Sequence, residues 1–333
     1  MSKPKIAVIG LGFMGEKWSR LVAESGLADL AVVSDVRREL GEEIASTYGA
    51  TFVPEPAEAA ARGEVDGVVV ATPEHLHFEA SMAAIESGKA VAIEKPIAHT
   101  IEDAERIRDR ALDAGVPVLA GHVLRFEPRY AAIRNAIDQD EVGEVQAIRS
   151  ERIGLVADQQ ILRGRTTIAL YYGVHEFDIA RWYAGDVATI AAARSTGVVQ
   201  EAGYDVEDLY SAVLSFRSGA HGTAMLGWSL PPRTPGYGLA SFTVIGERGV
   251  LQVSQGTTGF MKILSDGPAD VDVHYAPEVH GSTYGALGIE VDHFARVVRG
   301  EADPVCTADD GTEALRVSLA MEEAGATGEA VKL

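Results

Sequence analysis

Three glycines near the start of the chain have the spacing of a phosphate-binding turn. They lie in the run Gly10-Leu-Gly12-Phe-Met-Gly15, between an apolar β-branched stretch and a helical pattern. The first glycine permits a tight turn, the second lets a pyrophosphate approach the backbone, and the third lets the helix pack closely. The free N–H groups that open the helix would then face the phosphates. We expect this turn, with Phe13 and Met14 inside it, to bind a dinucleotide.

A carboxylate ends the next predicted strand. Asp35 follows the apolar run 30–34 and lies 20 residues after Gly15. A carboxylate there accepts hydrogen bonds from the adenosine ribose and repels a 2′-phosphate, which favours NAD over NADP. Arg37 and Arg38 keep NADP possible, because either guanidinium can pair with that phosphate. An ordinary βαβ unit with a glycine turn is the alternative.

Two polar segments follow later predicted strands. Ala71-Thr-Pro-Glu-His-Leu-His77 comes after the run 66–71, and Glu94-Lys-Pro96 closes the run 90–94. Ligands of open parallel sheets bind at the carboxyl ends of the strands. Four residues are therefore expected to line the nicotinamide side of the coenzyme: Thr72, Pro73, His77 and Glu94. No metal is expected, because the two histidines lack an evident third ligand and zinc spacing. Surface histidines in a helix-capping loop are the alternative.

Lys95 is the first candidate for proton transfer. Oxidising an alcohol removes a hydride from carbon and a proton from oxygen. Desolvation and a positive nicotinamide ring each lower the pKa of a lysine, so its amine can accept that proton near neutral pH. A solvated lysine beside a glutamate is the alternative.

His175 is the second candidate. It lies near the start of a predicted helix over residues 173–184, and Asp178 follows at i+3 on the same face. An imidazole at this place can exchange a proton with a substrate hydroxyl while the carboxylate orients it. A histidine satisfied within a helix cap is the alternative.

The elements that must hold these residues follow two patterns. Apolar strands alternate with amphipathic helices to residue 121, which predicts a doubly wound parallel sheet covered on both faces. Consecutive strand-like runs with short turns then predict an α+β domain with a large, open, mostly antiparallel sheet. We place the domains at 1–121, for the dinucleotide, and 122–333, for substrate and oligomerisation.

Composition narrows the partners and the compartment. The chain has 333 residues, a net charge of −20, and no apolar run near the length of a membrane span. The charge argues against nucleic acid and anionic membrane as partners. The N-terminus leads straight into the first strand, which leaves no room for a signal peptide, and Cys306 is the single cysteine. Both features favour the cytoplasm.

Taken in order, these segments resemble the glucose–fructose oxidoreductase / inositol dehydrogenase / MocA (Gfo/Idh/MocA) family. The resemblance implies an NAD(P)-binding Rossmann domain and a second domain whose open sheet joins a homodimer or homotetramer. It also implies hydride transfer between nicotinamide and a ring hydroxyl or ketone of a sugar or cyclitol. The matching segments are the glycine turn, Asp35, Ala71-Thr-Pro73 with His77, Glu94-Lys95-Pro96, Gly121-His-Val-Leu-Arg125-Phe-Glu-Pro128 and Gly173-x-His175-x-x-Asp178.

The resemblance further implies that Lys95 and His175 lie beside the nicotinamide. Arg125, Asp178 and Tyr284 are expected on the substrate side. Tyr171 is a departure, because many polyol dehydrogenases of the family have an aspartate four residues before the histidine. Its hydroxyl can bond a sugar but supplies no carboxylate.

Two alternatives stay open. A glycosidase or epimerase could use bound NAD without net oxidation. A nucleotide-responsive regulatory protein could retain the fold without catalysis, because a fold does not fix a function.

Overall fold

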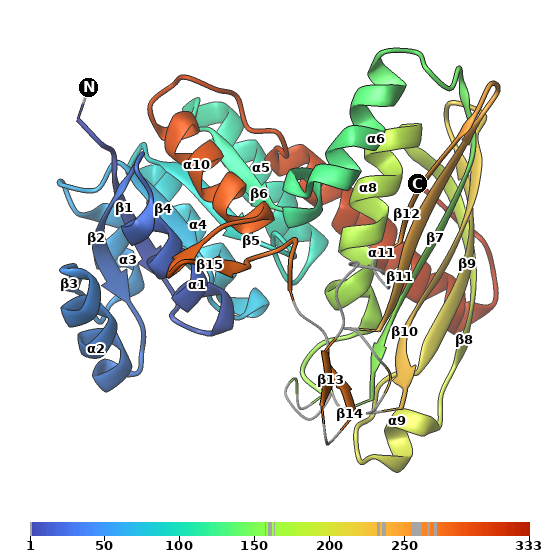
Figure 1. Ribbon diagram of the computed structural model, residues 1–333, viewed down its shortest axis with the longest axis horizontal. Helices are drawn as coiled ribbons and strands as arrows, with labels where there is room; N and C mark the ends of the chain where they lie inside the picture. The colour runs from blue at the N-terminus through green and yellow to red at the C-terminus, as the bar shows by residue number, and fades with distance from the viewer. Residues whose placement is uncertain are drawn as a thin grey trace. The chain divides into compact units, whose positions relative to one another are not determined.

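The computed structural model describes residues 2–333 apart from 157, 159–161, 163, 232–233, 235–237, 255–261, 265–266 and 270–271. The chain divides into two compact units (Figure 1). The first comprises Met1–Glu127 and His274–Thr312, and the second comprises Pro128–Val273 and Glu313–Leu333. A segment late in the sequence thus returns to the first unit, which a single boundary after residue 121 does not anticipate.

The first unit contains a six-stranded parallel sheet of order β3-β2-β1-β4-β5-β6. The strand order reverses between β1 and β4, and ligands of such sheets bind outside the carboxyl ends at that point. The predicted Rossmann sheet is therefore confirmed. Its strands are β1 (Lys5–Ile9), β2 (Asp29–Ser34), β3 (Thr51–Phe52), β4 (Gly67–Val70), β5 (Ala90–Glu94) and β6 (Val118–Gly121).

Helices complete this unit, and one of them comes from the returning segment. Trp18 and Phe294 meet edge to face, with ring centroids 6.4 Å apart, so α1 packs against α10. The helices are α1 (Phe13–Glu24), α2 (Arg38–Tyr48), α3 (Pro56–Ala61), α4 (His77–Glu86), α5 (Ile101–Ala114) and α10 (Ala286–Val298), with the short turns η1 (Glu74–Leu76) and η2 (Val123–Phe126) and the hairpin of β15 (Glu278–Val279) and β16 (Ser282–Thr283).

The second unit contains a seven-stranded sheet of order β12-β11-β7-β10-β9-β8-β17. Among the described strands of this second sheet, only β7 and β10 pair in parallel, so the predicted mostly antiparallel sheet is confirmed. The strands are β7 (Val145–Leu155), β8 (Val187–Ser195), β9 (Leu209–Phe216), β10 (His221–Leu230), β11 (Leu239–Gly246), β12 (Val250–Ser254) and β17 (Val331–Lys332).

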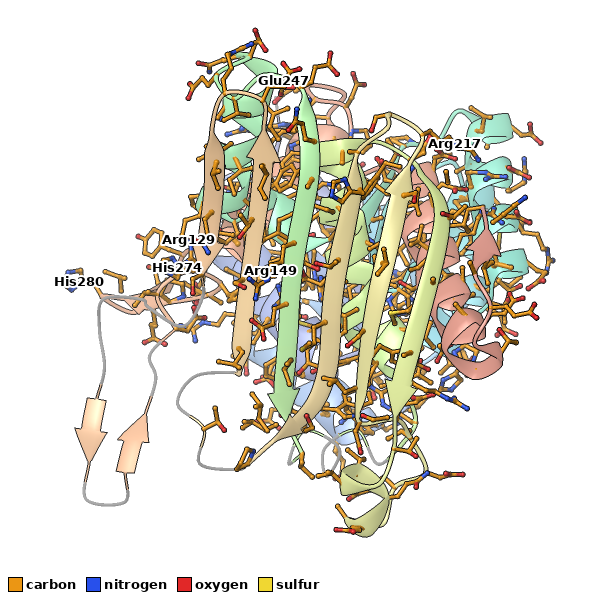
Figure 2. All side chains as sticks on the ribbon, turned by 90° about the vertical axis from the view of Figure 1, so that its right-hand side faces the viewer. Arg129, Arg149, Arg217, Glu247, His274 and His280 are labelled. Carbon is orange, nitrogen blue, oxygen red and sulfur yellow. The ribbon has the colours of Figure 1, made fainter. Side chains whose placement is uncertain are left out.

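The two faces of this sheet differ. Tyr183 of α8 and Tyr130 of α6 both meet Phe242 of β11 edge to face, so these helices cover one face. In the described part of the chain no helix covers the other face, onto which Figure 2 looks. The remaining elements are α6 (Pro128–Asp138), η3 (Ala169–Gly173), α8 (Val174–Ala184), α9 (Val198–Glu201), α11 (Ala308–Thr327), and a hairpin of β13 (Lys262–Leu264) and β14 (Gly267–Ala269).

The length and hydropathy of a helix decide whether it could cross a membrane. Within the described ranges, none of the helices is both long enough and apolar enough to cross a bilayer.

Candidate coenzyme and substrate site

The glycine turn forms a cradle at the start of α1. Gly10 has a φ of +86°, and a Cβ there would lie 2.5 Å from the Thr72 nitrogen. A Cβ on Gly15 would lie 1.7 Å from the Gly10 carbonyl oxygen, whereas one on Gly12 would meet nothing within 4 Å. Two glycines thus permit close packing, and the third borders open space that a phosphate can occupy.

The N-terminus of α1 suits an anion. No described side chain caps it at Gly12, and Phe13 at its first position is 78% exposed. The N–H groups of a first helical turn have no partner within the helix, and the helix dipole attracts negative charge there. This end of α1 can therefore bind a pyrophosphate.

Asp35 lies beside the cradle and is held by several donors. Its Oδ2 accepts the Leu11 N–H at 2.7 Å, and its Oδ1 accepts the Arg37 N–H at 2.8 Å. The Arg37 guanidinium adds two bonds, at 2.9 and 3.0 Å. Although burial opposes the charged form, these donors lower the pKa of the Asp35 carboxyl. The carboxylate is therefore ionised, with Arg37 already paired to it.

Thr72 and His77 stand at the carboxyl end of β4. The ring nitrogens of His77 lie 2.8 Å from the Pro96 carbonyl oxygen and 2.7 Å from that of Thr72. Burial lowers the pKa of His77 even though both carbonyls favour the charged ring. The imidazole thus joins two backbone segments. Thr72 Oγ1 is buried and has no hydrogen-bond partner among the described residues, so it can take a further hydrogen bond.

Glu94 and Lys95 stand at the carboxyl end of β5. Glu94 Oε1 accepts a hydrogen bond from Trp18 Nε1 at 2.8 Å, and its Oε2 accepts the Lys95 N–H at 3.3 Å. Burial raises the pKa of the Glu94 carboxyl, and the Trp18 bond and the Lys95 charge oppose this only in part. Lys95 is half-buried.

In the second unit, His175 follows a π-helical turn. That turn, Ala169–Gly173, widens the backbone just before α8, and such turns are frequent at functional sites. Glu176 is buried next to His175, and its Oε1 accepts a bond from Arg152 Nε of β7 at 2.5 Å. This ion pair ties the start of α8 to the sheet. Asp178 is fully buried on the same helix.

The π-helical turn also carries two tyrosines. Tyr171 and Tyr172 meet edge to face at 4.8 Å, and the Tyr172 hydroxyl donates to Asp158 Oδ2 at 3.0 Å. Burial, and then the Asp158 carboxylate, raise the pKa of both phenols, so both stay protonated near neutral pH. Asp158 was not among the predicted site residues, because no recognisable motif surrounds it in the sequence.

Arg125 and Tyr284 both belong to the first unit. The buried Arg125 donates to the Val305 carbonyl oxygen at 2.7 Å and pairs with Asp310 at 3.2 Å. Its guanidinium therefore anchors the segment before α11. Tyr284 is 55% exposed and lies just before α10.

The assembly of the whole site stays a prediction. Lys95 belongs to the first unit, and His175, Asp178 and Tyr171 belong to the second. Arg125 and Tyr284, which lie in the predicted substrate domain 122–333, belong to the first unit.

A phosphate cradle on a doubly wound parallel sheet, followed by an open mixed sheet, defines a dinucleotide-binding class of protein with two parts. Two family models match, one described as an oxidoreductase family with an NAD-binding Rossmann fold (residues 4–122) and one as its C-terminal alpha/beta domain (134–333). The chain therefore belongs to the Gfo/Idh/MocA family of oxidoreductases.

Curated relatives and solved structures agree with this assignment. The chain is 27% identical to scyllo-inositol 2-dehydrogenase (NAD(+)) of Bacillus subtilis, over 99% of this chain and 96% of that protein. A myo-inositol dehydrogenase structure from Corynebacterium glutamicum has a TM-score of 0.85 at 24% identity, over 100% of this chain and 99% of that one. The scyllo-inositol dehydrogenase of Lactobacillus casei, with bound NAD(H) and scyllo-inositol, has a TM-score of 0.84 at 20% identity, over 99% of each chain. Both structures share the fold.

Proposed function

We propose that this chain is an NAD-dependent dehydrogenase that transfers a hydride between nicotinamide and a ring hydroxyl or ketone of a sugar or cyclitol. One observation carries the proposal: the chain aligns over nearly its full length with an inositol dehydrogenase and has Lys95 and His175. The names of several relatives favour a cyclitol as the substrate class.

The first unit would hold the coenzyme. The cradle binds the pyrophosphate, and Asp35 accepts the ribose hydroxyls when Arg37 turns away from it. Thr72 Oγ1 is the polar atom left for the nicotinamide side, and His77 positions it through the Thr72 carbonyl. NAD supplies the hydride acceptor. The other residues proposed to line it are Phe13, Met14, Pro73 and Glu94.

Proton transfer would fall to Lys95. Its amine removes the hydroxyl proton during oxidation and returns a proton during reduction. His175 orients that hydroxyl or shares the proton. The substrate-side residues that we propose are Tyr171, Asp178, Arg125 and Tyr284, of which Tyr171 would act as a neutral hydrogen-bond donor.

A screen of sugars and cyclitols, with NAD and with NADP, tests the proposal through absorbance of the reduced nicotinamide. We expect NADH to form with at least one cyclitol or sugar. Product formation without net NADH would favour a glycosidase or epimerase. No turnover together with tight NADH binding would favour a regulatory protein.

Self-association through the bare sheet face is part of the proposal. Exposed apolar side chains on this face include Val213, Met225 and Ile245. Arg149 lies among the central strands of the same face (Figure 2). A mixed apolar and polar face of this kind suits a second copy of the chain, as a homodimer or homotetramer. A single cysteine fits a reducing cytoplasm.

A further inference from the structure

A buried acid in the first unit has no place in the mechanism above. Glu290 lies on α10 and is 0% exposed, and neither of its carboxyl oxygens has a hydrogen-bond partner among the described residues. An ionised carboxylate without partners is very costly in such surroundings. Glu290 is therefore neutral in the folded protein.

Trp18 links Glu94 to the helix that carries Glu290: its indole donates to Glu94 at 2.8 Å, and its ring meets Phe294, one helical turn after Glu290, at 6.4 Å. Burial, and then the Glu94 carboxylate, raise the pKa of Glu290 well above its ordinary value. Around Glu94 itself stand the Trp18 indole from α1 and Lys95 from the same strand end. Two buried carboxyls that interact in this way titrate as a pair, and both do not readily ionise together.

The pair lies at the coenzyme edge of the parallel sheet. Glu94 ends β5, which neighbours β4, the strand that leads to Thr72. Trp18, which donates to Glu94, lies on α1 three residues after the cradle glycine Gly15. A charged nicotinamide ring beside Thr72 would therefore act on the pair at short range and in low dielectric, whereas the pyrophosphate in the cradle is the same in both coenzymes.

We propose that Glu94 and Glu290 form a carboxyl pair that holds a proton in the free protein and releases it when an oxidised, cationic nicotinamide binds. This inference rests on the proposed function. A positive ring favours the second carboxylate, whereas the neutral reduced ring does not. Only the O–H bond of the protonated carboxyl breaks: the protonated pair and NAD⁺ give the complex and a proton in solution. NAD⁺ binding should therefore tighten with rising pH, by at most about tenfold per pH unit, and NADH binding should not.

The protonation of the pair is tested without coenzyme, by thermal unfolding between pH 5 and 8. In the unfolded chain Glu290 ionises near pH 4.3, but its pKa is raised in the folded chain, so stability is lost as the pH rises from about 4.3 toward the folded pKa. Glu290→Gln removes this loss. The Tm of Glu290→Gln minus that of the wild type should rise by about 2–4 °C for each pH unit. The Tm of the exposed control Glu86→Gln should change with pH as the wild-type Tm does. If the Tm difference between Glu290→Gln and the wild type stays constant from pH 5 to pH 8, the pair does not hold a proton and the proposal is wrong.

The linkage is tested by calorimetry of the intact chain with NAD⁺ and with NADH, in two buffers of different ionisation enthalpy. We expect proton release with NAD⁺ only, and at least a threefold smaller release in Glu290→Gln. Equal release with both coenzymes, or an unchanged release in the variant, would refute the proposal. If neither coenzyme binds, the proposed function fails together with the linkage, and the unfolding curves still decide whether the pair holds a proton.

Discussion

The polar residues around the cradle divide into those that hold the backbone and those left for a ligand. Both ring nitrogens of His77 face backbone carbonyls, and Arg125 forms an ion pair with Asp310. Thr72 Oγ1 has no partner among the described residues. The residue types in the sequence were enough to suggest these candidates. Only the hydrogen bonds in the structure show which of them hold the backbone and which are left for a ligand.

Coenzyme choice is expected to depend on Asp35 and its partner Arg37. Asp35→Ser removes the acceptor for the ribose hydroxyls and frees the guanidinium for a 2′-phosphate. We expect NAD affinity to fall about 5–30-fold, for the loss of about 1–2 kcal/mol, and NADP affinity to rise. Titration of both coenzymes measures the change, with exposed Glu39→Ser as the control. An unchanged NAD/NADP preference would remove Asp35 from coenzyme selection.

Lys95 is expected to carry the proton transfer. Lys95→Ala should lower kcat by about 10²–10⁴-fold, the usual contribution of a general acid–base group. NAD affinity should change little, because the phosphates and the ribose are bound elsewhere. Steady-state kinetics with coenzyme titration measures both, and exposed Lys332→Ala should behave as wild type. Near-normal turnover of Lys95→Ala would assign the proton transfer to another group.

At the scale of elements, the way in which α8 begins determines where His175 lies. The π-helical turn and the Arg152–Glu176 pair determine how α8 begins, and His175 lies at that start. Contacts made by its neighbours therefore help to position the His175 side chain.

The Arg152–Glu176 ion pair is expected to position His175. Glu176→Ala removes the carboxylate that compensates a largely buried guanidinium, which should cost about 3–5 kcal/mol of stability and lower kcat. Glu176→Gln keeps a hydrogen-bond acceptor and should retain more of both. Denaturant unfolding and kinetics measure the two effects. Glu151→Ala, on the opposite face of β7, is the control, and equal losses in Glu151→Ala and Glu176→Ala would contradict this role.

The sequence predicts most elements, because their signals are local. Apolar runs, glycine turns and the Thr100 cap of α5 each act within a few residues. The Asp158–Tyr172 bond and the Glu94–Glu290 pair join distant segments and have no local signal. One signal was available: Glu290 stands among Leu287, Val291 and Phe294 at core positions of a helix, where a lone carboxyl is unusual.

At the scale of the whole molecule, the chain forms two compact units. The first unit combines its Rossmann sheet with a helix from the returning segment, and the second presents a bare sheet face. The return of residues 274–312 could not be predicted from patterning, because periodicity defines an element but not the unit it joins.

The bare face is expected to bring copies of the chain together. Met225→Asp places a charge among the exposed side chains of this face, where a partner copy would have to desolvate it. Sedimentation should show an oligomer for the wild type and a smaller species for the variant. Exposed Leu112→Asp, on α5, is the matched control. A wild-type monomer, or an oligomer that survives Met225→Asp, would locate any interface elsewhere.

A crystal structure of the chain with NADH and a cyclitol that it turns over tests the account most directly. We predict that Lys95 Nζ and a ring nitrogen of His175 both lie within hydrogen-bond distance of one substrate hydroxyl, beside the nicotinamide. A complex in which the two nitrogens face different parts of the ligand, or in which the reduced ring lies away from Lys95, would contradict it.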